Sequence, residues 1–210
     1  MKSSINVSKE HNKENESAKP NPILDKIKSR YILSKIYNNM RIKKKLQIVK
    51  YNKKIQNRLD LDVKDYKECS NIEIEIIPTK DKYGKFINVN KKNKLYYHIY
   101  FNDNKEEIKN KYEINEEDKV AKIKIIINYQ VKSFKVLFFE CECIESINFK
   151  KFYRNNITDM SCIFFGCSTL KELNPNNFNI NNVTNMESMF KGCSSLKELN
   201  FNNFNNKNFI

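Results

Sequence analysis

A segment of 26 residues recurs at a fixed interval through the C-terminal part of the chain. Its copies begin at Val131, Ile157 and Val183, and they align without a gap. The same columns are hydrophobic in every copy, and one column holds cysteine in all three: Cys141, Cys167 and Cys193. Such repetition is typical of architectures in which each unit buries its apolar side only against its neighbours. The repeat therefore predicts three stacked units over residues 131–210.

Two hydrophobic patterns follow each other within each unit. In the third unit, MESMF (residues 186–190) has apolar residues three and four positions apart, which is the spacing of one helical turn. SLKELNF (residues 195–201) alternates as a short strand does, and KGCSS between the two supplies the turn. We expect an α/β fold: a short solenoid of three 26-residue units whose strands run parallel.

The segment VTNMESMFKGCSSLKELNFNNF resembles the BspA-like leucine-rich repeats, and the resemblance extends over residues 131–210. It implies a parallel-stranded solenoid that binds proteins, often at a cell surface. Two departures stand out: the chain has three repeats where members of the family tend to have many, and its N-terminus lacks the export signal of surface members. We expect the last strand to leave an open edge at which chains can associate. Pro175, which occupies the place of Phe201, predicts a short or distorted strand in the second unit.

The sequence before the repeats divides into three regions. Residues 1–20 are polar and are predicted to be disordered. Residues 21–62 contain two helical patterns separated by an Asn-Asn pair, which predicts a basic helical hairpin. Residues 63–130 contain the alternating runs NIEIEIIP, KLYYHIYFN and VAKIKIIINY, which are typical of strands, and one charged run suited to a helix. We expect a small mixed α+β region that caps the first repeat.

Positive charge is concentrated near the N-terminus. The chain has a formal net charge of +14, and the segment from Lys26 to Arg58 contains 12 lysines or arginines and no acidic residue. Such a segment attracts nucleic acid or an anionic surface. The alternative is a solvated lysine-rich face without a ligand.

Part of the same segment, residues 27–56, resembles an F-box. Ile32, Leu33, Ile36 and Tyr37 match the first half of that pattern, whereas its usual Leu-Pro and its tryptophan are missing. The resemblance implies a substrate adaptor of a ubiquitin ligase, with the repeats holding the substrate.

The sequence lacks the motifs of the common enzyme classes. It has three glycines and no phosphate-binding loop, and its two histidines are far from each other and from the cysteine-rich region. We predict no enzymatic activity, no catalytic residue and no cofactor. The cysteine column is expected to hold buried thiols rather than a metal. Without a signal peptide or a membrane span, a cytoplasmic protein is expected rather than a cell-surface one.

We therefore expect a non-catalytic protein-interaction module. Recognition is predicted along the outward row of the repeat strands, where asparagine recurs and offers both donors and acceptors. The predicted partner-binding residues are Ser146, Asn148, Lys150, Glu172, Asn174, Asn176, Glu198, Asn200 and Asn202. The alternatives are the adaptor, a surface adhesin, and a binder of nucleic acid or an anionic surface through residues 26–58.

Overall fold

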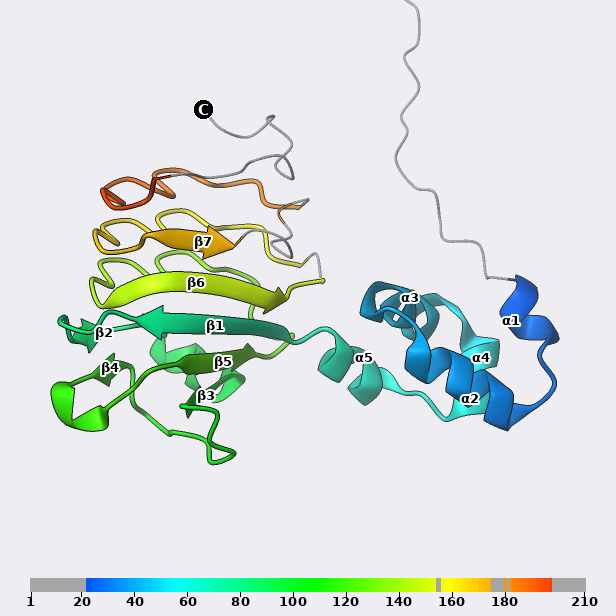
Figure 1. Cartoon of the computed structure of the whole chain (residues 1–210). Coiled ribbons are helices and arrows are strands. Elements are labelled where there is room, and N and C mark those ends of the chain that lie inside the picture. The colour runs from blue at the N-terminus through cyan, green and yellow to red at the C-terminus, as the bar shows by residue number, and fades with distance from the viewer. Residues whose placement is uncertain (1–21, 154–155, 175–179, 181, 198–210) are drawn as a thin grey trace, which may run out of the picture. The chain divides into compact units, whose positions relative to one another are not determined.

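The structure is a computed structural model that describes residues 22–153, 156–174, 180 and 182–197 (Figure 1). The chain divides into two compact units, with the boundary in the sequence between Asp62 and Val63.

The first unit consists of short helices. They are α1 (Pro22–Lys26), α2 (Arg30–Asn39), α3 (Ile42–Tyr51) and α4 (Lys53–Leu59). Ser29 caps α2, because its hydroxyl accepts a hydrogen bond from the Ile32 amide, and the Asn52 side chain caps α4 in the same way. From residue 22 onward, the described part of the N-terminal region therefore contains four helices and not the expected two-helix hairpin, since residues 27–29 interrupt the first helical pattern and Asn52 interrupts the second.

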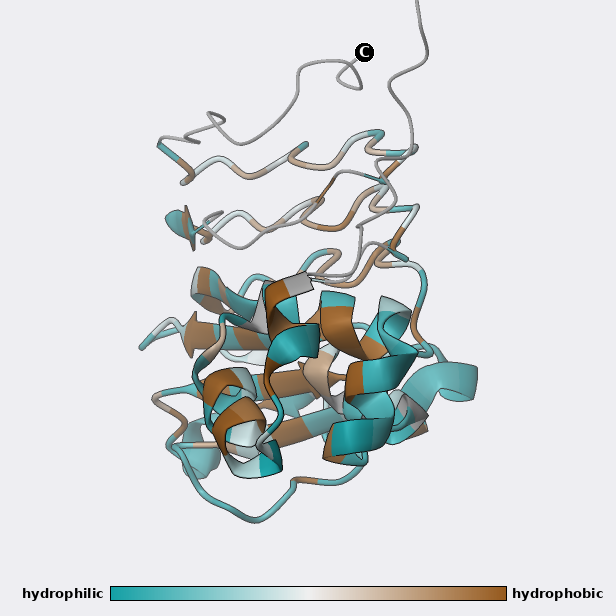
Figure 2. Cartoon of the chain, turned by 90° about the vertical axis from the view of Figure 1, so that its right-hand side faces the viewer, coloured by the Kyte–Doolittle hydropathy of each residue, from teal (hydrophilic) through white to brown (hydrophobic). Residues whose placement is uncertain are grey.

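The helices of this unit are amphipathic, as the mixture of brown and teal on each of them shows (Figure 2). Their apolar sides form a small core, which contains Leu24, Leu33, Tyr37, Leu46, Ile48, Val49 and Ile55. Several lysines lie over tyrosine rings, and Arg30 forms an ion pair with Asp60. Most of the cationic side chains point into solvent.

The second unit is built on a five-stranded mixed sheet. Its elements are α5 (Val63–Cys69), β1 (Ile72–Pro78), β2 (Gly84–Lys85), the 3₁₀ helix η1 (Lys91–Tyr96), β3 (Tyr97–Phe101), β4 (Glu113–Ile114), the 3₁₀ helix η2 (Glu116–Asp118), β5 (Ile123–Ile127), β6 (Ile144–Lys151) and β7 (Glu172–Asn174). The strand order is β3-β5-β1-β6-β7, and β2 pairs with β4 in a separate two-stranded sheet. Neighbouring strands are antiparallel except for β6 and β7, which are parallel.

Alternation along the strands divides the five-stranded sheet into a buried and an accessible face. In β1 and β5 every second residue is buried, and the buried residues are isoleucines apart from Pro78. The buried rows continue across the sheet, with Ile76 opposite Ile147 and Ile147 opposite Leu173. One apolar core therefore joins the strands before the repeats to the strands of the repeats.

The expected fold class, a leucine-rich-repeat solenoid with parallel strands, a helical hairpin and a separate cap, is wrong. Three of the five strands come from residues before the repeats, and β1 pairs antiparallel with β6. The sheet is mixed because β6 would otherwise expose an edge of unpaired backbone groups, and β1 supplies the missing hydrogen bonds. The period of the repeat indicates that units lie side by side, but it contains no information about what pairs with the first one.

The expected helical turn in each unit is also wrong. In the described part of the repeats, residues 135–140, 161–166 and 187–192 form successive turns and no α-helix. Alternate amides bond in two directions: that of Phe138 donates to the Ile163 carbonyl of the next unit, whereas that of Leu137 donates to Phe134 three residues back. Turns combined with bonds between units thus replace the bonds of a helix.

Candidate functional site: the accessible face of the sheet

The predicted partner-binding residues that the structure describes lie on β6 and β7. Ser146, Asn148 and Lys150 share one face of β6, and they alternate with residues that enter the core. Glu172 and Asn174 flank the buried Leu173 on β7. The predicted residues Asn176, Glu198, Asn200 and Asn202 lie outside the described residues.

The strand pairing brings these side chains together in two rows. Ser146 is opposite Glu172, and Asn148 is opposite Asn174, in the parallel register of β6 and β7. The second row continues across the sheet, because Glu75 of β1 is opposite Asn148 and Lys124 of β5 is opposite Glu75. Polar side chains from four strands therefore form one continuous row on the accessible face.

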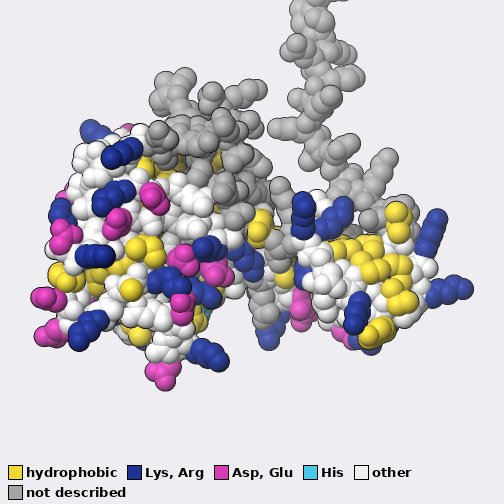
Figure 3. All heavy atoms as spheres, in the orientation of Figure 1, with side chains coloured by type: hydrophobic (Ala, Val, Ile, Leu, Met, Phe, Trp, Pro, Cys, Tyr) yellow, Lys and Arg dark blue, Asp and Glu magenta, His cyan; other side chains and the backbone are white. Residues whose placement is uncertain are grey.

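Ion pairs cross the strands of this face. The Lys150 ammonium lies 3.0 Å from a carboxylate oxygen of Glu75, and Lys124 lies 3.5 Å from Glu73. Asp103 accepts a hydrogen bond from Lys122 and raises the pKa of that ammonium group, with a smaller effect from Glu75. Figure 3 shows acidic and basic side chains next to one another over these strands. The face is thus polar and carries both signs of charge.

Sequence reasoning did not find the part of this face that lies before the repeats. The alternation in NIEIEIIP indicates that Glu73 and Glu75 share a face, but not that this face continues that of Asn148. Only the antiparallel pairing of β1 with β6 places these residues together.

The cysteine column lies at the inner corner of the repeats. The Cys167 thiol donates a hydrogen bond to the Phe138 carbonyl over 2.9 Å, and the Cys193 thiol donates to the Phe164 carbonyl over 3.0 Å. Burial raises the pKa of Cys167 to about 12 and that of Cys193 to about 11. These thiols therefore stay protonated and connect each unit to the one before it.

Replacing Cys167 with serine is expected to change how stability depends on pH. The pKa of this thiol rises from its ordinary value of 9.0 to about 12 on folding. The contribution of the protonated thiol to stability is therefore fully present below pH 9, and it is lost as the pH rises toward 12. The difference in unfolding free energy between the wild type and Cys167→Ser should therefore fall above pH 9, by up to about 1.4 kcal/mol per pH unit. Urea unfolding of both proteins between about pH 8 and pH 10.5 measures this, and parallel pH curves would contradict it.

The described residues offer neither a cluster of metal ligands nor a membrane-spanning helix. No group of three or more His, Cys, Asp or Glu side chains there could hold a metal ion. No described helix is long and apolar enough to cross a membrane.

A family model described as "Mycoplasma protein of unknown function, DUF285" matches residues 129–210. The matched segment contains the three repeats, β6 and β7, and it leaves out β1, β3 and β5. No curated protein and no solved structure matches the chain.

Proposed function

We propose that the chain is a non-catalytic protein-interaction module that binds a protein partner through the accessible face of the five-stranded sheet. The observation that carries this proposal is the continuous polar row in which Asn174, Asn148, Glu75 and Lys124 are neighbours across four strands. Their strands pack on the core beneath them through the alternating buried residues, so the four side chains share one register before a partner arrives.

The chemistry of the row suits a protein surface. Amide side chains both donate and accept hydrogen bonds, and they can pair with a polar loop or with the side chains of another sheet. The ammonium and carboxylate groups beside them add charge complementarity, which mainly favours specificity and the rate of association. Asn148 and Asn174 are the two amide side chains of this row, and they lie side by side on the parallel strands β6 and β7.

The same face is poorly suited to nucleic acid. Binding to phosphates depends on cations that are available to replace counterions. On this face Lys150 and Lys124 already lie beside Glu75 and Glu73, so a phosphate would meet carboxylates together with the cations. A protein partner with mixed charge avoids this repulsion.

Placing bulky charged side chains in the polar row tests the proposal. The double variant Asn148→Arg with Asn174→Arg adds two bulky cations to the face. Its control, Thr158→Arg with Glu187→Gln, makes the same change in net charge at exposed positions of the repeats outside β6 and β7. We expect affinity capture from a cell extract to recover at least one protein with the wild type and the control, and about tenfold less of it with the face variant.

Circular dichroism of each protein is the check that the variants are folded. A set of captured proteins that is the same for the face variant and the wild type would overturn the proposal. A loss that is equal in the face variant and the control would show a general effect of charge and would also overturn it.

A further inference from the structure

A second surface of the same unit is concave and basic. Two adjoining hollows of about 710 Å³ and 330 Å³ share Lys94, Tyr97 and Tyr112 in their walls. We call this pair of hollows the basic trough. Tyr97 belongs to the buried row of β3, so the trough opens on the opposite side of the sheet from the polar row. The volume of each hollow falls within the range of known ligand pockets.

The charges around the trough are unbalanced. Five ammonium groups line it, those of Lys85, Lys91, Lys94, Lys109 and Lys135, together with the two carboxylates of Glu107 and Glu113. In the part of the chain that the structure describes, none of these five lysines forms an ion pair, whereas Glu107 lies 3.0 Å from His98. The trough therefore has more cationic than anionic side chains in its walls.

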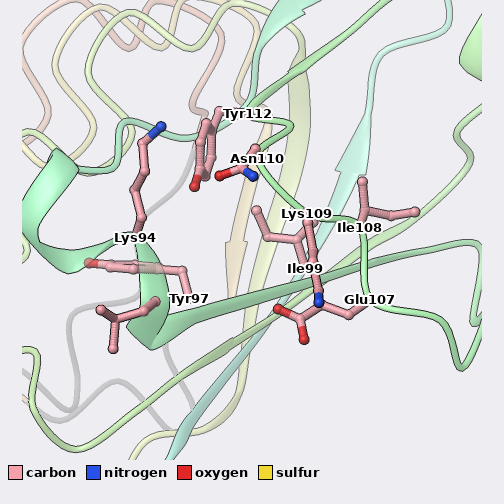
Figure 4. A pocket seen from close by; sticks show the side chains of 9 residues that line it. Lys94, Tyr97, Ile99, Glu107, Ile108, Lys109, Asn110 and Tyr112 are labelled. Atoms are coloured by element: carbon pink, nitrogen blue, oxygen red, sulfur yellow. The ribbon is translucent and has the colours of Figure 1, made fainter.

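Aromatic and apolar groups accompany the lysines. The Lys94 ammonium lies over the Tyr112 ring, 5.1 Å from its centre, and Figure 4 shows Lys94 reaching toward that ring. Leu95 in one hollow is 69% exposed, and Val136 in the other is 37% exposed. Burial raises the pKa of Tyr112, so its hydroxyl remains a hydrogen-bond donor. Each hollow thus offers an apolar contact beside positive charge.

The walls of the trough are tied together by hydrogen bonds to backbone carbonyls. The Asn88 amide donates to the Leu137 carbonyl over 2.7 Å, and the Asn88 side chain donates to the Phe139 carbonyl over 2.7 Å. These bonds hold the segment before η1 against the first repeat. The Phe86 amide bonds to the Tyr112 carbonyl and fixes the other wall. A preformed site of this kind binds without a large ordering cost.

We propose that the basic trough binds an extended acidic peptide segment of a partner protein, with apolar side chains between its carboxylates. The carboxylates would lie against the lysines, and the apolar side chains would cover Leu95 and Val136. An inorganic phosphate would leave both apolar groups in water, and the trough contains no arginine for bidentate phosphate contacts. This site is separate from the polar row of the sheet, and either can exist without the other.

Binding of two labelled peptides to the full chain tests the proposal by fluorescence polarisation. One peptide alternates pairs of glutamates with leucine, and its matched partner has serine in place of each leucine. The trough variant is Lys91→Glu with Lys135→Glu, which reverses one exposed lysine on each wall. The control is Lys44→Glu with Lys54→Glu, which makes the same charge change at exposed positions of the helical unit. Leu95→Ser is a separate variant that leaves the charge unchanged.

We expect the leucine peptide to bind the wild type and the control alike, and the trough variant about tenfold more weakly. Leu95→Ser should reduce the preference for the leucine peptide over the serine peptide. The face variant Asn148→Arg with Asn174→Arg should bind the peptide as the wild type does, so failure of this proposal is distinguishable from failure of the proposed function.

Three results would overturn the proposal. The first is an equal loss of binding in the trough variant and the control, because the helical unit would then hold the peptide. The second is equal affinity for the leucine and serine peptides. The third is displacement of the peptide by inorganic triphosphate or by a single-stranded oligonucleotide at lower concentrations than by unlabelled peptide, which would assign the site to phosphate.

Discussion

Replacing Phe164 with alanine is expected to lower the free energy of unfolding of the repeat-containing unit by about 3–5 kcal/mol. Phe164 is fully buried, and its ring stacks between Phe138 and Phe190 of the neighbouring units, with ring centres 5.7 and 5.5 Å apart. Removing it leaves a cavity that both neighbours line, and the units cannot move together because backbone hydrogen bonds fix their spacing. Urea unfolding followed by circular dichroism measures the loss.

Phe165→Ala is the matched control for this prediction. Phe165 also stacks on a ring of the previous unit, Phe139, at 5.0 Å, but it is only half-buried. Its loss should cost about 1 kcal/mol, because less apolar surface leaves contact with protein. Equal effects of the two substitutions would contradict the stacked core. They would show that the full burial of Phe164 contributes no more to stability than the partial burial of Phe165.

Gly166→Ala is expected to destabilise the same unit by about 2–3 kcal/mol. Gly166 has a φ of +71°, a left-handed backbone conformation that residues other than glycine rarely adopt. A Cβ atom there would lie 2.9 Å from Cγ and 3.5 Å from Cα of Glu140 in the previous unit. The substitution therefore adds backbone strain and a steric clash between units, and urea unfolding again measures the sum.

A double-mutant cycle with Glu140→Gly separates the two causes. In the Glu140→Gly background the clash is absent, so Gly166→Ala should cost only the backbone strain of about 1–2 kcal/mol. A cost that is the same in both backgrounds would exclude the close approach of Gly166 to Glu140. A negligible cost in both would show that the chain does not adopt the left-handed conformation at this position.

The turns of the repeats could not be predicted from the sequence, because few of their positive-φ positions hold glycine. In its described residues each unit has two positions with positive φ, 26 residues from their counterparts: Val136, Cys162 and Ser188 at the first position, and Glu140, Gly166 and Gly192 at the second. Glycine, the usual marker of this conformation, occupies only two of the six positions. The spacing of MESMF matched a helical turn equally well, so pattern alone favoured the wrong structure.

The polar row was partly accessible to sequence reasoning. Alternation along ESINFKK is sufficient to put Ser146, Asn148 and Lys150 on one face, because side chains of a strand point to opposite sides in turn. The basic trough was not accessible in this way. Its lysines are spread from residue 85 to residue 135, and no local pattern connects them.

The sequence by itself determined the period of the repeat and the apolar columns that stack between units, because identical segments bury identical side chains against each other. It also determined which residues of each strand avoid the core, because alternation is a local property of the backbone. Only the tertiary structure decided that β1 closes the first repeat in an antiparallel pair, and that Lys91 and Lys135 border one trough. Hydrogen-bond pairing between strands depends on backbone groups that every residue except proline carries in full, so the identity of the side chains does not specify the partner.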